Sequence, residues 1–435
     1  MKKVIFQLLF ASVGFLGCSS SLALDKDLGN DNIEKPSDKE NNDNENSILP
    51  LWQEGELLIH AINTGRGECM FYILPDGTTM LVDAAGSLLE TDPKSMPTAP
   101  KHNSSITSGK VIADYIRHFI PVKSGGKLDY FLLTHYHEDH MGSVSKTKSD
   151  KGDFYDMSMS EVASAFHIKT FIDRDYPSFD TPTELDMDNN KMRNYKKFLE
   201  WTKTANGTKV ERFVVGSDNQ FILNFEATRY PDFSIRNIAA NGQVWTGNGL
   251  EYSSEIPPRE SFASLSADAL PPENILSCVF MLHYGKFDYF AGGDIQYNGR
   301  SSYAWRDIEA PVAEVVSDVE VMKACHHGTS NCNSDALLRK LNPEVMIANV
   351  WRDVQPNPAT MDRMWGINGR CDIFTTNFAD KNKQIFGTEL SKFKSTGGHI
   401  VVKVVNQGAE YYVFVLDDND QEYKVKSTYG PYKAQ

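Results

Sequence analysis

One segment, residues 134–140 (THYHEDH), constrains this chain more than any other. It places three histidines and two carboxylates directly after the apolar residues 130–133, which have the composition of a buried strand. A strand that ends in such a cluster brings several imidazole and carboxylate groups to one point. Those groups are the ligands that zinc takes at catalytic sites, so the segment predicts a metal site at a strand end.

The residues before this motif predict three strands and a helix. Apolar runs separated by Gly- and Pro-containing turns are typical of an antiparallel meander, and the third run ends in Asp83. Helical spacing of apolar residues, closed by Pro121, predicts a helix before the strand that carries the motif. The expected elements are strands at residues 56–63, 69–74, 78–83 and 128–133, and a helix at 108–120.

A second ordered block repeats this organisation. A hairpin over residues 275–295 ends in Asp294, and a strand over residues 319–325 ends in His326 and His327. Two successive blocks therefore send strands to ends that carry candidate ligands. They predict a mixed α/β fold of two halves, packed as a four-layered αββα sandwich.

The N-terminus predicts export. A basic start is followed by apolar residues 4–16, which are too few to span a membrane and are typical of a signal peptide. The Gly17-Cys18 pair that follows resembles a bacterial lipoprotein signal, which predicts lipidation at Cys18. Plain secretion with cleavage near Ala23 is the alternative. We expect a protein of the cell envelope, held on the membrane through Cys18 if that residue is acylated, and otherwise periplasmic or secreted.

Composition divides the rest of the chain. Asp, Glu, Asn and Lys dominate residues 25–46, which hold too few apolar groups to fold. Residues 234–269 are rich in Ser, Gly, Asn and Pro, which indicates loops or a lid. The expected parts are a signal peptide at residues 1–18, a disordered acidic tether at 19–50, a folded domain at 51–420 with an irregular insertion at 143–270, and a C-terminal tail at 421–435.

Charge limits the partners. The net charge is −14 and no block of Lys or Arg occurs, which argues against duplex DNA or RNA. A small phosphate-bearing substrate stays compatible with this charge, because a bound metal supplies positive charge locally. Nothing in the sequence specifies an oligomeric state.

Five cysteines follow the leader, and their spacing indicates neither a disulfide framework nor a zinc ribbon. Buried free thiols are the favoured interpretation. A Cys332–Cys371 disulfide is the alternative in an oxidising compartment.

Together, these motifs resemble the metallo-β-lactamase superfamily. A strand-end Asp83, HxHxDH at residues 135–140, Gly-Asp at 293–294 and strand-end histidines at 326–327 follow one another in that order. More narrowly, four segments resemble the metallo-hydrolase domain of bacterial competence DNA-uptake (ComEC-type) proteins and related phosphodiesterases: residues 63–68 (NTGRGE), 81–86 (LVDAAG), 292–295 (GGDI) and 326–330 (HHGTS).

The resemblance implies a dinuclear centre and a role for each residue. Asp294 would bridge the two metals, and Asp83 would orient ligands through hydrogen bonds. Asp139, His326 and His327 would be the catalytic residues, because the histidine of the pair that does not bind metal can contact substrate or donate a proton. The implied metal ligands are His135 and His137 at the first metal, Asp139 and His140 with one of His326 and His327 at the second, and Asp294 at both.

The sequence departs from the family pattern twice. Many members have a further ligand of the first metal at a position corresponding to residues 272–277, where this chain has no histidine. Water or His399 would then complete that metal site. In residues 63–68, Glu68 stands where the family usually has Asp, and Arg66 is added. Arg66 is a candidate contact for a substrate phosphate, with a surface salt bridge as the alternative.

We therefore expect an exported metal-dependent hydrolase. Two metal ions, Zn²⁺ or else Mn or Fe, would hold a bridging hydroxide that attacks a phosphoester or phosphodiester. One alternative is hydrolysis of a carboxylic ester, lactone or β-lactam by the same centre. A second alternative is a metal-binding protein without turnover.

Overall fold

The structure is a computed structural model that describes residues 47–86, 98, 101, 105–181, 190–266, 269–297, 303–369 and 371–435. The predicted signal peptide, Cys18 and nearly all of the predicted tether lie outside these residues. In the part of the chain that is described, no helix has the length and apolar character needed to cross a membrane.

The first sheet contains the predicted meander and the strand that carries the motif. Its strand order is β18-β17-β16-β1-β2-β3-β4-β5-β6. Strands β1 to β3 pair antiparallel, whereas β3 to β6 pair in parallel. The strands are β1 (Leu57–Ala61), β2 (Met70–Ile73), β3 (Thr79–Val82), β4 (Lys127–Leu133), β5 (His167–Asp173), β6 (Lys209–Arg212), β16 (His399–Val405), β17 (Glu410–Leu416) and β18 (Val425–Lys433).

The second sheet has a similar mixture of pairings. Its order is β15-β14-β13-β12-β11-β10-β7-β8-β9. The predicted hairpin, β10 with β11, is antiparallel, and β11 to β15 are parallel. The strands are β7 (Phe233–Ala240), β8 (Gln243–Trp245), β9 (Tyr252–Ser254), β10 (Val279–Tyr284), β11 (Phe287–Ala291), β12 (Val321–Lys323), β13 (Val345–Ala348), β14 (Asp372–Thr375) and β15 (Phe393–Thr396).

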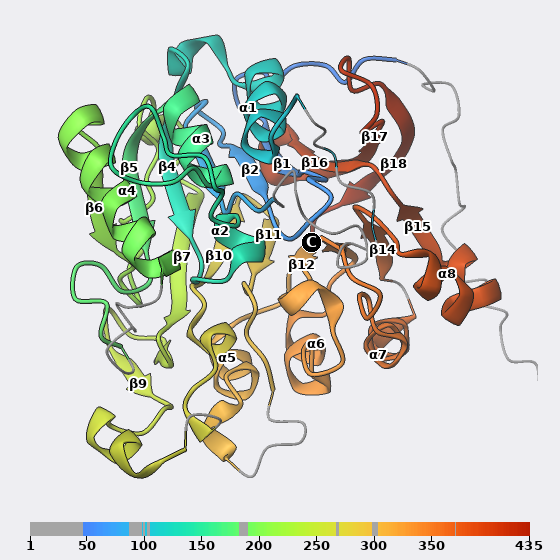
Figure 1. Cartoon of the computed structure of the whole chain (residues 1–435). Helices are drawn as coiled ribbons and strands as arrows, with labels where there is room; N and C mark the ends of the chain where they lie inside the picture. The colour runs from blue at the N-terminus through green and yellow to red at the C-terminus, as the bar shows by residue number, and fades with distance from the viewer. Residues whose placement is uncertain are drawn as a thin grey trace, which may run out of the picture. The chain divides into compact units, whose positions relative to one another are not determined.

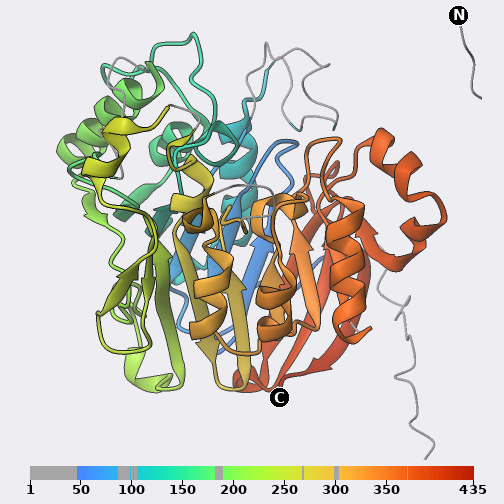
Figure 2. The ribbon, with the colours of Figure 1, turned by 90° about the horizontal axis from the view of Figure 1, so that it is seen from below.

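Helices cover the outer face of each sheet. Apolar side chains of α1, α3 and α4 pack on the first sheet, and those of α5, α6 and α7 pack on the second (Figure 1). Figure 2 shows the helices of the second sheet in front of its strands. The predicted αββα sandwich is confirmed. The helices are α1 (Ser108–Phe119), α2 (Glu138–Met141), α3 (Ser158–Ala165), α4 (Asn190–Asn206), α5 (Glu309–Val315), α6 (Asp335–Leu341), α7 (Pro358–Asn368) and α8 (Asp380–Phe386).

Strand alternation builds the layers. In β1, Leu57 and Ile59 belong to the core between the sheets, whereas Leu58 between them packs toward the helices. The hydroxyls of Tyr72 and Tyr289 form a hydrogen bond of 3.1 Å across the inner layer. Because both faces of the central strands are buried, the strands present continuous apolar runs rather than alternation.

Residues 143–270 differ from the irregular insertion that was predicted. They supply β5 and β6 to the first sheet and β7 to β9 to the second. The polar composition of residues 234–269 indicated loops or a lid, although β9 in this segment is a strand, because β9 lies exposed at the edge of the sheet. The predicted C-terminal tail is likewise wrong, since β18 pairs with β17 as another half-exposed edge strand.

All five cysteines after the leader are buried free thiols, so the alternative Cys332–Cys371 disulfide is not formed. Burial raises the pKa of each thiol above its usual value. Protonated, buried thiols are chemically inert.

Candidate metal centre

Four strand ends meet at one end of the sandwich. Strands β3 and β4 are parallel neighbours in the first sheet, and β11 and β12 are parallel neighbours in the second, so each pair ends at one edge. A hydrogen bond of 3.0 Å from Cys278 N to Thr134 O joins the two sheets there. The residues that follow these strands are Asp83, the motif at 135–140, Asp294, and the pair His326 and His327.

The backbone turns sharply at these strand ends. Asp83, His326 and His327 have φ angles of 58°, 47° and 54°, in the left-handed region that non-glycine residues rarely adopt. Such a conformation costs about 1–3 kcal/mol per residue and persists only where surrounding contacts enforce it. Strain of this kind concentrates at functional sites.

The motif divides into two pairs. His135 and His137 flank Tyr136, and their Nε2 and Nδ1 atoms lie 3.1 Å apart. His137 is the N-cap residue of the short helix α2, which contains Asp139 and His140. The change from extended chain to helix keeps the His140 ring 4.1 Å from that of His135, whereas Asp139 faces His327.

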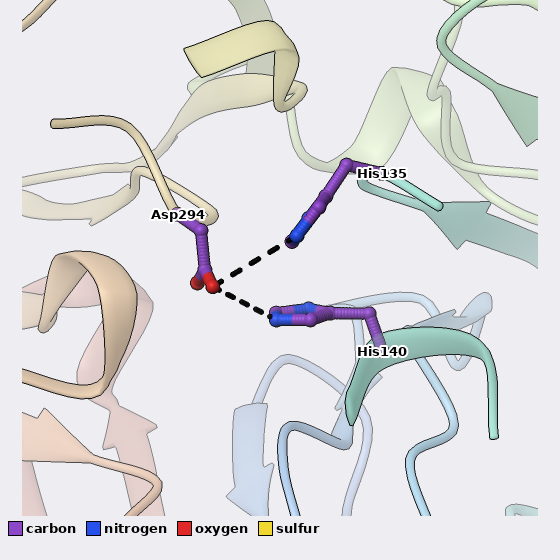
Figure 3. Close-up of side chains that lie close together, drawn as sticks. All are labelled: His135, His140 and Asp294. Carbon is purple, nitrogen blue, oxygen red and sulfur yellow. Dashed lines mark hydrogen bonds and ion pairs between the residues drawn. The ribbon is translucent and has the colours of Figure 1, made fainter. Parts of the chain in front are cut away.

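The Asp294 carboxylate is the centre of the cluster. Figure 3 shows the rings of His135 and His140 directed at it from the end of the first sheet. The distances from Asp294 Oδ2 are 3.1 Å to His140 Nε2, 3.6 Å to His327 Nε2, 3.8 Å to His326 Nε2 and 3.9 Å to His135 Nε2. On the other side, His327 Nε2 lies 3.4 Å from Asp139 Oδ2.

Hydrogen bonds to the outer ring nitrogens set which nitrogen faces the cluster. His140 Nδ1 donates to Asp83 Oδ2 at 2.7 Å, and His327 Nδ1 donates to the carbonyl of Asn349 at 2.9 Å. Each donation leaves the lone pair on Nε2, directed inward. His135 Nδ1 has weaker partners, the hydroxyls of Thr134 at 3.2 Å and Ser277 at 3.3 Å.

The charges in the cluster are strongly coupled. Burial alone would raise the pKa of Asp294, but the adjacent histidines, His140 first, hold that pKa well below its usual range. Burial lowers the pKa of His140, yet Asp294 and Asp83 together raise it well above its usual value. Burial also lowers the pKa of His135. Without an added cation, a shared proton has to stabilise this set of carboxylates.

The donor set fits a metal ion. Asp294 Oδ1 and His327 Nε2 are buried and have no hydrogen-bond partner among the described residues. Imidazole and carboxylate groups suit zinc, manganese or iron. Two groups made up only of predicted ligands, each with ligand atoms within 4.8 Å of one another, share His140: His135, His140 and Asp294, and Asp139, His140 and His327. Among the described residues, His137 belongs to no such group.

The His326–His327 pair separates into two environments. The His327 side chain is fully buried and faces Asp139 and Asp294. The His326 side chain is 21 % exposed. Its ring contacts the amides of Gln296 and Asn274 at 2.9 and 3.1 Å. Burial lowers the pKa of His326 to about 4. Of the two histidines, His327 has the geometry of a ligand.

His399 is not brought into the cluster, which removes it as one of the two alternatives, water or His399, for completing the first metal site. Its Nδ1 accepts a hydrogen bond of 3.0 Å from Asn63 N, and its ring packs 4.5 Å from that of Tyr115. Burial lowers its pKa to about 4. This histidine is a satisfied core residue at the start of β16.

Arg66 lies beside the motif and is only partly exposed, at 16 % of its side chain. One guanidinium nitrogen donates to Ser143 Oγ at 2.9 Å, and another lies 3.3 Å from Glu138 Oε2. The guanidinium also stacks 5.1 Å from the ring centroid of Trp351. Its Nε is buried with no partner among the described residues. Both predicted roles for Arg66, a substrate contact and a salt bridge, are compatible with this position.

An ion pair between the buried Arg174 and the partly exposed Glu273 holds the backbone between His135 and His137. Glu273, in the segment where the expected histidine is missing, accepts 2.8 Å hydrogen bonds from Tyr136 N and from Arg174 Nε, and its second oxygen accepts another from Arg174 Nη2. The Arg174 guanidinium, fully buried, lies 4.4 Å from the Tyr136 ring centroid. The pair therefore fixes the turn that carries both histidines.

Sequence reasoning assigned no role to Arg174, Glu273, Lys323 or Asn349, and noted Glu68 only as a departure. Lys323 was the most legible of them, because a lysine inside the apolar strand β12 has to be paired. Its partner is Glu68, at 2.5 Å. The Arg174–Glu273 contact joins the two sheets and follows only from their stacking, whereas Asn349 follows β13, the parallel neighbour of β12 in the second sheet.

No protein-family model and no curated protein sequence matches this chain. Among solved structures, it is similar to a protein described as a metal-dependent hydrolase from Parabacteroides distasonis, with 12% identity over 73% of this chain and 92% of that one, at a TM-score of 0.32. It is also similar to a diphosphatase of the PhnP family, with 8% identity over 80% of this chain and 97% of that one, at a TM-score of 0.33. Similarity at this level does not define a reaction, and the chemistry follows from the residues of this chain.

Proposed function

We propose that this protein is a metal-dependent hydrolase with a dinuclear centre. One observation carries the proposal: four imidazole Nε2 atoms lie between 3.1 and 3.9 Å from one oxygen of the buried Asp294 carboxylate, whose other oxygen has no partner among the described residues. Donors gathered this closely in a buried site are favourable only around positive charge. A pair of divalent ions supplies that charge.

Two ligand sets share Asp294 in this proposal. The missing histidine at residues 272–277 leaves the first set with fewer protein ligands, so water or substrate completes it. The proposed sets are His135, His137 and Asp294 at the first ion, and Asp139, His140, His327 and Asp294 at the second.

When bound, two such ions activate water as a nucleophile and stabilise negative charge in the transition state. The residues of the chain keep this arrangement in place. Asp83 orients the ring of His140, and the Asn349 carbonyl orients that of His327. Burial excludes bulk water from Asp294 and strengthens every charge interaction around it. We assign a substrate contact to His326, which lies at the exposed side of the cluster.

We favour a phosphoester or phosphodiester substrate because of Arg66. Its guanidinium lies next to Glu138 of the motif and is partly exposed, and a planar guanidinium binds phosphate oxygens well. Hydrolysis of a carboxylic ester, lactone or β-lactam is the second candidate for the same centre. The predicted signal and lipidation at Cys18 would place this activity in the cell envelope.

Metal analysis combined with turnover of bis-p-nitrophenyl phosphate tests the proposal. We expect about two zinc ions per chain and turnover that a chelator abolishes and zinc restores. Asp139→Ala should lose turnover by at least about a thousandfold, or about 4 kcal/mol of transition-state stabilisation. Asp153→Ala is the matched control, because Asp153 is exposed and pairs with surface lysines.

Other outcomes separate the alternatives. Turnover of nitrocefin or a lactone without turnover of any phosphoester would overturn the proposed substrate class. Two bound ions without turnover of any of these substrates would favour a metal-binding protein that is not an enzyme.

A further inference from the structure

A buried ion pair lies directly behind the ligand cluster. Glu68 Oε2 and Lys323 Nζ are 2.5 Å apart, and their side chains are only 2 % and 1 % exposed. Lys323 Nζ also donates to the carbonyl of Gly293, next to Asp294, at 2.8 Å. Burial opposes its charge, but Glu68 and Asp294 raise the pKa of Lys323, so the lysine stays protonated.

The Glu68 carboxylate is within reach of both sides of the cluster. One of its oxygens lies within 4.8 Å of ligand atoms of Asp294 and His327. A second such group joins Glu68 to Asp83 and His140. Glu68 is therefore a potential metal ligand whose negative charge is already neutralised by its ion pair with Lys323.

The backbone of Glu68 cannot carry its side chain away from this place. Its N–H donates to the carbonyl of Asp139 at 2.8 Å, and its own carbonyl accepts from Ala85 N at 3.0 Å. The preceding residue has to be glycine, because a Cβ at Gly67 (φ 72°) would lie 2.0 Å from Asp139 O. Only rotation of the side chain decides whether its carboxylate faces Lys323 or the ligand cluster.

We propose that Glu68 is a reserve metal ligand that Lys323 holds out of the coordination sphere. The inference rests on the proposed function, since it requires bound ions. With the lysine in place, the centre keeps open positions for water and substrate, as a catalytic rather than a structural site requires. Without the lysine, the carboxylate turns to the ions, and the extra oxygen ligand favours manganese, which suits carboxylate ligands, over zinc.

The test measures metal affinity rather than activity, by competition with a chelator for Zn²⁺ and Mn²⁺. Lys323→Met removes the charge at similar length. We expect it to bind Mn²⁺ at least about tenfold more tightly than the wild type. We also expect Mn²⁺ to raise its melting temperature more than that of the wild type. In the double variant Lys323→Met/Glu68→Gln, which removes both charges, the Mn²⁺ affinity should return to within about threefold of the wild type.

Unchanged or weaker Mn²⁺ binding by Lys323→Met would overturn the inference. If that variant does not fold, the double variant still decides. A loss of about a hundredfold in its metal affinity would mean that Glu68 already binds metal in the wild type, and this too would overturn the inference. A wild-type protein that binds neither ion would instead contradict the proposed function itself.

Discussion

The two halves of the ligand cluster are held by different means. In one half, formed by Asp139, His140 and His327, the outer ring nitrogens donate to a carboxylate and to a backbone carbonyl at 2.7 and 2.9 Å. In the other, formed by His135 and His137, only hydroxyls at 3.2 and 3.3 Å contact the outer nitrogen of His135. That half depends on the Arg174–Glu273 pair to hold its backbone.

The difference concerns rigidity. A hydrogen bond to an ionised acceptor is about twice as strong as one between neutral groups and fixes a ring in one orientation. A hydroxyl can rotate and leaves the ring freer. The Asp139–His140–His327 half should therefore bind its ion more tightly, and the His135–His137 half should exchange its ion more readily.

Replacing Asp294, which both halves share, should abolish the difference in metal affinity between them, because neither half should keep its ion. Because Asp294 contributes to both halves, we expect Asp294→Asn to lose both ions and to lower kcat/KM by about a thousandfold or more. Metal content and turnover, measured on the same sample, check this. One ion retained in the variant would mean that Asp294 serves a single half.

Replacing the outer partner of each half should separate them. Asp83→Asn keeps the size of the side chain and tolerates the left-handed backbone but removes the charge. We expect a fall of about 10–100-fold in metal affinity or activity. Ser277→Ala should lower either by less than about fivefold, because its hydroxyl contacts with His135 Nδ1 (3.3 Å) and Asp294 N (3.1 Å) are long and neutral. Titration of the metal-free variants with zinc measures their affinities. Equal losses of affinity in the two variants would contradict the proposed difference in rigidity between the halves.

The backbone clamp should matter mainly for the His135–His137 half. Glu273→Gln leaves Arg174 buried with a neutral partner, so we expect a loss of about 3 kcal/mol in the free energy of unfolding. Affinity for the more weakly held ion should fall by about tenfold, with the tighter ion unaffected. Urea denaturation and a two-step metal titration measure the two effects. A fall in affinity for both ions would mean that the Arg174–Glu273 pair supports the whole metal centre and not one half of it.

The smallest effect on turnover is expected at Glu309, which accepts hydrogen bonds of 2.6 Å from Asn333 N and Ser334 N in the loop after His327. Burial raises its pKa from 4.5 to about 7. The folded state therefore binds this proton more tightly than the unfolded state, and the corresponding stability is present below pH 4.5 and lost as the pH rises through 7.

That shift corresponds to about 3 kcal/mol. Glu309→Gln should remove this dependence, so the free energy of unfolding of the variant should improve relative to the wild type between pH 5 and pH 8 by about that amount. Turnover should change less than about threefold. Urea denaturation of both proteins at pH 5 and pH 8 measures the free energies of unfolding. The same change with pH in the wild type and the variant would contradict the expectation.

The sequence predicted the layers of the fold and the residues that the structure brings together at the strand ends. Both could be predicted because they depend on short stretches of sequence: the motif is contiguous, and parallel strands of one sheet end at one edge. Edge strands such as β9 and β18 were missed since their exposed faces leave no apolar pattern. Glu273 was missed because the stacking of the sheets brings it to Tyr136. Asn349 was missed because it contacts His327 through its backbone carbonyl, a group that every residue has.

The left-handed backbone at Asp83, His326 and His327 has a consequence for engineering. At each of these positions glycine would relieve strain, and it would also delete a side chain from the centre. A screen for thermostability without a turnover assay would therefore select glycine substitutions that stabilise the fold and abolish the function of the centre. Any stabilised variant of this chain needs these three positions kept constant.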